Sequence, residues 1–142
     1  MIPSLPGGGH FKGAQAVALA VFLARSGASR QQMRSEIATR LGYDLERTVA
    51  AIRPTYNFDV AAQRSVPEAI LCFLDAQDFE GAVQNAISLG GDADTIACIA
   101  GAIAEAHWGE VPPAIATEVR KRLPPEFLQL LDRFRTRFGL SP

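Results

Sequence analysis

The sequence predicts an all-α protein, a compact bundle of about seven to eight helices around a central helix rich in small residues. Three observations support this prediction. No segment has a convincing strand pattern. Several segments are rich in Ala and Leu, and most of these begin after a polar capping residue or end at a glycine. With 142 residues, 48% of them hydrophobic, the chain is expected to form one domain, 1–142, with a flexible Gly- and Pro-rich start over residues 1–11.

Two helices are predicted near the start of the chain. Residues 12–26 form the first, and Gly27 after it is a typical C-terminal capping residue. Ser29 begins the stretch S-R-Q-Q, a capping box in which Gln32 occupies the third helical position. This second helix is expected to end near Gly42.

The following segment predicts a short helix, a loop and a longer helix. Asp44 is expected to cap the short helix. The stretch P-T-Y-N-F-D-V-A-A-Q-R (54–64) has no clear period and predicts a loop. Ser65 begins S-V-P-E, a second capping box, with Pro67 early in the helix and Glu68 in the reciprocal position.

Four further helices are predicted, over residues 78–89, 92–108, 113–123 and 125–138. Asp78 is expected to cap the first of them. The helix at 92–108 carries Ala93, Ala97 and Gly101 on one stripe, and such small residues allow another helix to approach closely. A glycine inside a helix costs about 1 kcal/mol relative to alanine, so Gly101 indicates close packing. This helix is expected to be the central one.

Composition and charge narrow the possible functions. The net charge of −1 provides no basic surplus, which argues against a nucleic-acid partner. The apolar run at 96–104 is far shorter than the roughly 20 residues that span a bilayer, and residues 1–10 lack the pattern of a signal peptide. Cys72 and Cys98 are expected to be buried free thiols, and a cytoplasmic location is expected.

The candidate site is the stretch S-L-G-G-D-A-D-T before the most apolar helix. Residues two apart in a helix lie about 200° apart around its axis, so Asp92 and Asp94 converge only if the Gly-Gly turn keeps Asp92 in the loop. With the hydroxyl of Thr95 they would form a set of oxygen ligands that suits Mg²⁺. The alternative is that Asp92 caps the helix and Asp94 complements its macrodipole.

The stretch G-G-D-A-D-T-I-A-C-I-A-G-A-I-A-E-A-H-W-G closely resembles the C-terminal motif of the ADP-ribosylglycohydrolase family, which includes the dinitrogenase reductase-activating glycohydrolases. The stretches K-G-A-Q-A-V-A-L-A-V-F-L-A-R, G-Y-D-L and S-V-P-E-A-I-L-C-F-L-D-A-Q-D-F-E-G-A-V occur in the order of that family, so the resemblance covers roughly residues 4–109. It implies an all-α fold and a two-magnesium site that hydrolyses the N- or O-glycosidic bond between ADP-ribose and a protein side chain or small molecule. It also implies that Asp92, Asp94 and Thr95 are metal ligands and that the two aspartates are catalytic.

The chain departs from this family in its acidic residues. The first half of family members contributes a threonine followed by two adjacent aspartates, whereas no two of the fifteen acidic residues here are adjacent. A glycine- and asparagine-containing segment that helps to hold ADP-ribose is also absent. We therefore expect weak or absent Mg²⁺ binding and no activity of the chain alone. Activity would need a homo-oligomer or a complementing N-terminal half. The alternative is a non-catalytic helical module for protein interaction or ligand binding.

A second departure concerns the histidines. Relatives carry a Ser/Thr-His pair and a His-Pro-Glu-Gly run near the first helix, and here Leu5, Gly7 and Gly9 replace the polar residues. His10 lies one turn from the position of a family histidine and is expected not to compensate. His107 is expected to pack or cap at a helix end.

Overall fold

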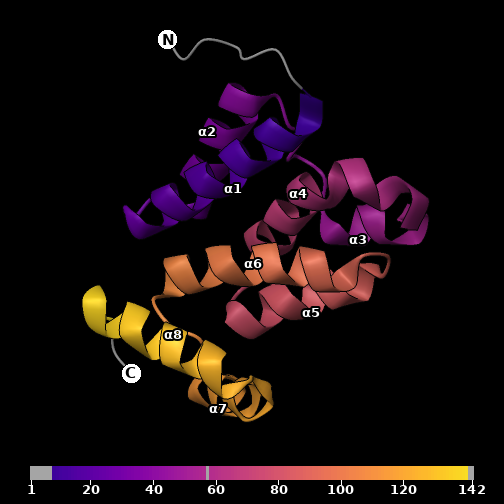
Figure 1. Ribbon diagram of the computed structural model, residues 1–142. Helices are drawn as coiled ribbons and strands as arrows, with labels where there is room; N and C mark the ends of the chain where they lie inside the picture. The colour runs from indigo at the N-terminus through magenta and orange to yellow at the C-terminus, as the bar shows by residue number, and fades with distance from the viewer. Residues whose placement is uncertain (1–7, 57, 141–142) are drawn as a thin grey trace. The chain divides into compact units, whose positions relative to one another are not determined.

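The computed structural model describes residues 8–56 and 58–140, and the side chains of residues 11–56 and 65–140. These residues form eight α-helices, one 3₁₀ helix and no strand, which confirms the all-α prediction (Figure 1). The elements are α1 (Gly8–Arg25), α2 (Arg30–Leu41), α3 (Val49–Ile52), η1 (Arg53–Thr55), α4 (Phe58–Leu74), α5 (Phe79–Leu89), α6 (Ala93–Trp108), α7 (Pro113–Arg122) and α8 (Pro125–Arg137). Within the described part of the chain, no helix is long and apolar enough to cross a bilayer.

The chain divides into two compact units, Met1–Glu110 and Val111–Pro142. The second unit consists of α7 and α8, which are joined by an ion pair of 2.7 Å between Arg120 Nη2 and Asp132 Oδ1. The candidate site lies in the first unit.

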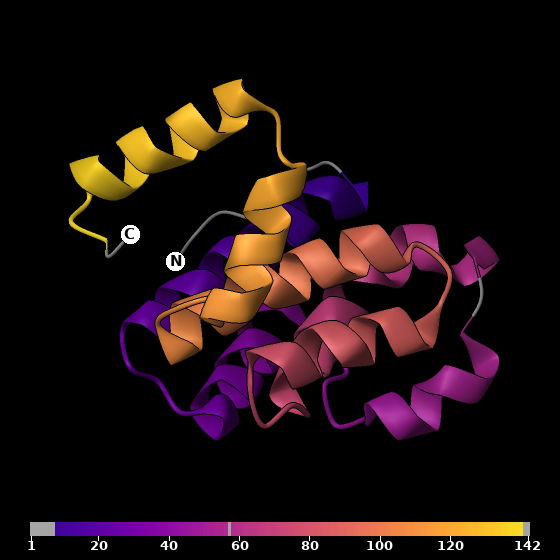
Figure 2. The ribbon, with the colours of Figure 1, turned by 90° about the horizontal axis from the view of Figure 1, so that it is seen from below.

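Helix α6 is the central helix of the first unit, as the sequence predicts. It packs against α5, α4 and α1, and Figure 2 shows α5 and α6 side by side, joined by a short turn. Ile96, Ala100 and Ile103 are fully buried because they face these neighbours. The apolar stretch 69–74 of α4 is also buried, so α4 and α6 both contribute to the core of this unit.

Aromatic packing connects the end of α6 to α4. The ring of Phe73 lies edge-on to His107 and Trp108, with centroid distances of 5.3 and 5.5 Å. This confirms that His107 is a packing residue. Two effects lower the pKa of His107. Burial is the larger, and the positive charge of Arg30 is the smaller.

Several helix ends follow local capping signals. Ser29 Oγ accepts from the Gln32 N–H at 3.1 Å, and the Gln32 side chain accepts from the Ser29 N–H at 2.8 Å, so the predicted capping box is confirmed. Helix α2 ends at Gly42, which has a φ of 65°. Asp78 caps α5 by accepting from the Gly81 N–H at 2.7 Å, also as predicted.

The predicted loop over residues 54–64 is wrong for most of its length. Helix α4 already begins at Phe58, so Ser65 lies inside it rather than at its start, and Pro67 is an interior proline. The S-V-P-E pattern is a local signal. Pro67 has no N–H and so cannot donate a helical hydrogen bond, but packing of the long buried segment of α4 compensates this loss and keeps the helix continuous. Glu68 therefore has no capping role.

Two other predicted helix starts differ from the structure. The short helix α3 is capped by Thr48, whose hydroxyl accepts from the Ala51 N–H at 3.2 Å, so the prediction for Asp44 is wrong. The Asp44 carboxylate pairs instead with Arg47 at 3.3 Å. Helix α1 begins at Gly8, inside the segment expected to be flexible, and residues 1–7 lie outside the described residues.

Two expectations about side chains of α6 are also wrong. A Cβ at Gly101 would lie 3.8 Å from Phe79 Cζ and from Val83 Cγ2, which is ordinary van der Waals contact, so no unusually close packing requires glycine there. Cys98 is exposed, while Cys72 is buried as expected.

Candidate metal site at the start of α6

The turn between α5 and α6 depends on two glycines. Gly90 and Gly91 have φ values of 72° and 61°, which L-residues with side chains rarely adopt. The Gly90 N–H donates to the carbonyl of Ile87 at 3.1 Å, which ends α5. After this turn Asp92 has φ −81° and ψ 61°, so it is still outside the helix. The chain therefore enters α6 in the way that convergence of the two aspartates requires.

The side chains of Asp92 and Asp94 lie close enough to interact. Hydrogen bonds lower the pKa of Asp94. The one with the Asp92 side chain has the largest effect, and the one from the Thr95 N–H is next. The Thr95 N–H lies 3.0 Å from Asp94 Oδ1. Asp92 stands at the N-cap position but accepts no side-chain capping hydrogen bond. The alternative in which Asp92 acts as an N-cap is therefore wrong for its side chain.

The donor set fits one side of a hydrated Mg²⁺ ion. Carboxylate and hydroxyl oxygens are ligands that Mg²⁺ accepts, and this ion usually retains several waters. Thr95 and Asp94 are exposed, so an ion can reach them. Among the described residues, however, no three His, Cys, Asp or Glu side chains lie close enough together to hold a metal. Asp92, Asp94 and Thr95 could thus supply only part of the coordination sphere of an ion.

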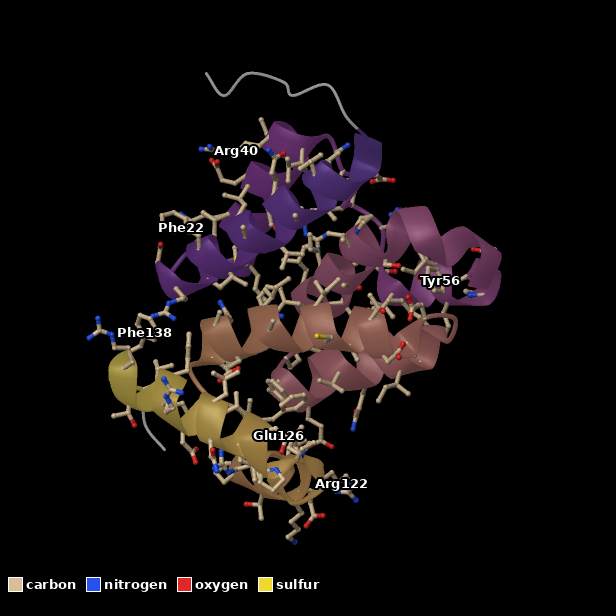
Figure 3. The ribbon with its side chains drawn as sticks, viewed as in Figure 1. Phe22, Arg40, Tyr56, Arg122, Glu126 and Phe138 are labelled. Carbon is tan, nitrogen blue, oxygen red and sulfur yellow. The ribbon has the colours of Figure 1, made fainter. Side chains whose placement is uncertain are left out.

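Tyr56 is a further residue beside this site, and the sequence analysis missed it. It follows η1, and Figure 3 shows it next to the end of α6 at which the glycine turn lies. Burial is the main reason why the pKa of Tyr56 is raised, and the negative charge of Glu68 is the next. The negative charge of Asp92 also raises this pKa, so both carboxylates act on the Tyr56 hydroxyl. Tyr56 was missed because it lies in the segment predicted as a loop.

A side-chain contact holds η1 against the end of α5. Arg53 Nε donates to Ser88 Oγ at 3.1 Å, and Ser88 Oγ in turn donates to the Asn85 carbonyl at 2.7 Å. Ser88 lies in the last turn of α5, two residues before Gly90. The contact thus joins two segments that are distant in sequence, η1 and the end of α5.

Glu68 is a buried polar residue of α4. Its side chain is 1% exposed, and Oε1 accepts from Arg47 Nη1 at 3.0 Å. Oε2 is also buried but has no hydrogen-bond partner among the described residues. A buried carboxylate oxygen without a partner is costly to stability.

The remaining predicted positions do not join the site in the described part of the chain. Leu5 and Gly7 lie outside the described residues, and Gly9 and His10 belong to α1 with side chains that are not described. His107 lies at the opposite end of α6 from Asp92.

Comparisons with known proteins show the family of the chain. The family model described as ADP-ribosylglycohydrolase matches residues 7–141, which extends the similarity through α7 and α8. The chain is 36% identical to ADP-ribosylhydrolase ARH3 of Danio rerio over 92 residues, which are 57% of this chain and 24% of that protein. It is 33% identical to ADP-ribosylhydrolase ARH3 of Bos taurus over 115 residues, 71% of this chain and 32% of that protein. The chain thus aligns with about a quarter to a third of these relatives. No solved structure matches it significantly.

Proposed function

Because this chain belongs to the ADP-ribosylglycohydrolase family, we propose that it supplies one side of a magnesium site for hydrolysis of the glycosidic bond of ADP-ribose. The substrate class is ADP-ribose attached to a protein side chain or to a small molecule. The observation that carries the proposal is the convergence of the Asp92 and Asp94 carboxyl groups at a helix start that Asp92 does not cap.

Each residue of the partial site has a distinct role in this proposal. Asp92 and Asp94 bind cations and neutralise their charge, and the Thr95 hydroxyl adds a neutral ligand beside them. When bound, two Mg²⁺ ions orient a water and polarise the substrate oxygens. The hydrogen bond from the Thr95 N–H to Asp94 holds that carboxylate in one orientation before an ion arrives.

The number of ligands limits what the chain does alone. Two carboxylates and one hydroxyl leave most positions around two octahedral ions to water or to another protein segment. We therefore propose little or no turnover by this chain alone. Ligands would come from a second copy of the chain or from a segment that carries Thr-Asp-Asp. The second candidate function, a non-catalytic ligand-binding module, is favoured by the absence of a third carboxylate near the site in the described residues.

Calorimetric titration with Mg²⁺ tests the cation site. We expect weak binding by the wild type, with a dissociation constant on the order of millimolar, and at least about tenfold weaker binding by Asp94→Asn. Asp78→Asn is the matched control, because it also removes one aspartate charge while asparagine retains the N-cap. Equal affinities of the wild type and Asp94→Asn would refute the site.

Release of ADP-ribose from a modified peptide tests the activity. The chain alone should be nearly inactive with Mg²⁺, and activity should rise when the N-terminal half of a relative with the Thr-Asp-Asp motif is added. Activity in the mixture that Asp94→Asn abolishes would support catalysis. A mixture that stays inactive although it forms a complex and binds Mg²⁺ would favour the non-catalytic module.

A further inference from the structure

Within the second unit, one face of α8 is apolar and exposed. Its large side chains, which are between 42% and 63% exposed, are those of Phe127, Leu130, Leu131, Phe134 and Phe138. Since an α-helix has 3.6 residues per turn, positions with this spacing lie within about 100° of one another and form one continuous stripe. We call this stripe the apolar face of α8. Contiguous exposed apolar residues of this kind mark interaction surfaces.

Helix α7 contacts a different side of α8. Asp132, which pairs with Arg120 of α7, and the half-buried Leu128 lie about 100 to 140° around the helix from the centre of the apolar face. Inside that face the rings of Phe134 and Phe138 pack on each other, with a centroid distance of 4.6 Å. The apolar face is thus left open by the other helix of its own unit.

Charged residues border one side of the apolar face. Glu126, Arg133 and Arg137 follow one another at spacings of seven and four residues, so they lie on the same side of the helix. Glu126 belongs to the first turn of α8 and Arg137 to the last. Figure 3 shows Glu126 and Phe138 at opposite ends of this helix. The sign of the charge therefore reverses along this border.

Such a reversal favours pairing of α8 with an antiparallel copy of itself. When a two-fold axis relates two antiparallel helices, the same side of each helix meets, and the start of one lies beside the end of the other. Glu126 of each copy then lies beside Arg137 of the other, which gives two attractive contacts next to the packed apolar faces. A parallel pair would instead bring groups of like charge to the same height.

We propose that the apolar face of α8 binds the same face of a second copy of this chain, with the two helices antiparallel. At the exposed fractions given above, each of the five side chains contributes on the order of 100 Å², so pairing would bury about 500 Å² per copy. A total of about 1,000 Å² lies at the low end for specific interfaces, so the dimer should be weak. The pairing uses no residue of the candidate metal site and does not depend on the proposed function.

A lipid surface fits the apolar face less well. Amphipathic helices that bind anionic bilayers have a polar face rich in Lys and Arg. Here the carboxylate of Glu126 borders the apolar face, and Lys121 and Arg122 of α7 already pair with Glu118 at 2.6 and 3.2 Å. These charges favour a protein partner that carries both signs, as a second copy does.

Sedimentation velocity of the full chain at increasing concentration tests the pairing. The wild type should shift from monomer to dimer with a dissociation constant on the order of 10 μM. Phe134→Glu places a charge within the apolar face and should weaken dimerisation by at least about 100-fold. Phe22→Glu is the matched control, because Phe22 is also exposed but belongs to α1, and this variant should dimerise like the wild type.

Two charge reversals test the antiparallel arrangement. Glu126→Arg and Arg137→Glu each replace two attractive contacts by two repulsive ones, so each variant alone should dimerise about tenfold more weakly than the wild type. An equimolar mixture of these two variants should form a heterodimer, because every arginine at the border then meets a glutamate of the other copy. Circular dichroism establishes that each variant retains its helices.

Three results would overturn the pairing: a wild type that stays monomeric, a dimer that Phe134→Glu does not weaken, or a mixture that associates no better than the single variants. The lipid alternative has its own readout. A monomeric wild type that sediments with vesicles of phosphatidylcholine and phosphatidylserine, and a Phe134→Glu variant that does not, would replace the second copy with a lipid surface.

Discussion

Nη1 of Arg47 donates to Oε1 of Glu68 at 3.0 Å, and this ion pair joins the segment before α3 to the middle of α4. The partners differ in environment, because the Arg47 side chain is 30% exposed while that of Glu68 is 1% exposed. Arg47 is fixed further by hydrogen bonds to the Asp44 carbonyl. The pair thus compensates a negative charge that is buried in α4.

Removing only the arginine should destabilise the protein. Arg47→Met leaves Glu68 buried without its counter-ion, which we expect to lower the free energy of unfolding by about 2 kcal/mol, less than for a fully buried pair because Arg47 is partly solvated. The double variant Arg47→Met/Glu68→Met should recover most of this loss. Urea denaturation measures both. Arg40→Met is the control, because its exposed pair with Glu36 should contribute under about 0.5 kcal/mol.

The two aspartates that precede α5 and α6 should differ in their effect on stability. Asp78→Ala should cost about 1 kcal/mol, since it removes the 2.7 Å hydrogen bond to the Gly81 N–H. Asp92→Ala should cost clearly less, because Asp92 makes no side-chain capping hydrogen bond. Denaturation in urea without divalent cations measures both. Equal losses would contradict the geometry at the start of α6.

Alanine should be tolerated at Gly101. The added methyl group would make ordinary contacts of 3.8 Å with Phe79 and Val83, so the helix propensity of alanine should stabilise the protein by up to about 1 kcal/mol. Gly13 is the comparison, because a Cβ there would lie 3.2 Å from Val66 Cγ2 and the neighbour would have to move. Gly13→Ala should therefore gain less. A marked loss of stability in Gly101→Ala would show that close packing does require glycine.

The two thiols should differ strongly in reactivity. Cys98 is exposed on α6, whereas burial, followed by the negative charges of Glu68 and Asp75, raises the pKa of Cys72 to about 12. A thiol reagent at mildly alkaline pH should thus modify Cys98 rapidly in the folded chain and Cys72 only after denaturation. Cys98→Ser should abolish the rapid phase. Mass spectrometry of labelled peptides identifies the modified residue.

Stability should fall as the pH falls through the titration of His107. Its pKa in the folded chain is below the ordinary value of 6.5, so just below that pH the unfolded chain binds a proton that the folded chain does not. The free energy of unfolding therefore decreases from about pH 7 downward until the lowered pKa is passed. His107→Phe retains a ring against Phe73 and should weaken this dependence. Urea denaturation at several pH values provides the measurement.

The sequence by itself determined most helix ends and the composition of the candidate site. Ser29, Asp78 and Gly42 act through hydrogen bonds or backbone angles within a few residues, so their effect is encoded locally and the predictions from them are confirmed. The same holds for the turn before Asp92, because two adjacent glycines favour positive φ angles wherever they occur. The family could also be inferred from the sequence, since its motif is contiguous.

The tertiary structure decided which distant segments meet. Arg47 pairs with Glu68 of α4, and Arg53 of η1 binds Ser88 at the end of α5, so these contacts join segments that are far apart in the sequence. The local S-V-P-E pattern predicted a helix start at Ser65, but burial of α4 on several sides outweighed it and extended the helix back to Phe58. Exposure of Cys98 likewise depends on which faces of α6 have neighbours. Local hydrogen bonds define where helices begin and end, whereas apolar burial between distant segments determines which side chains meet.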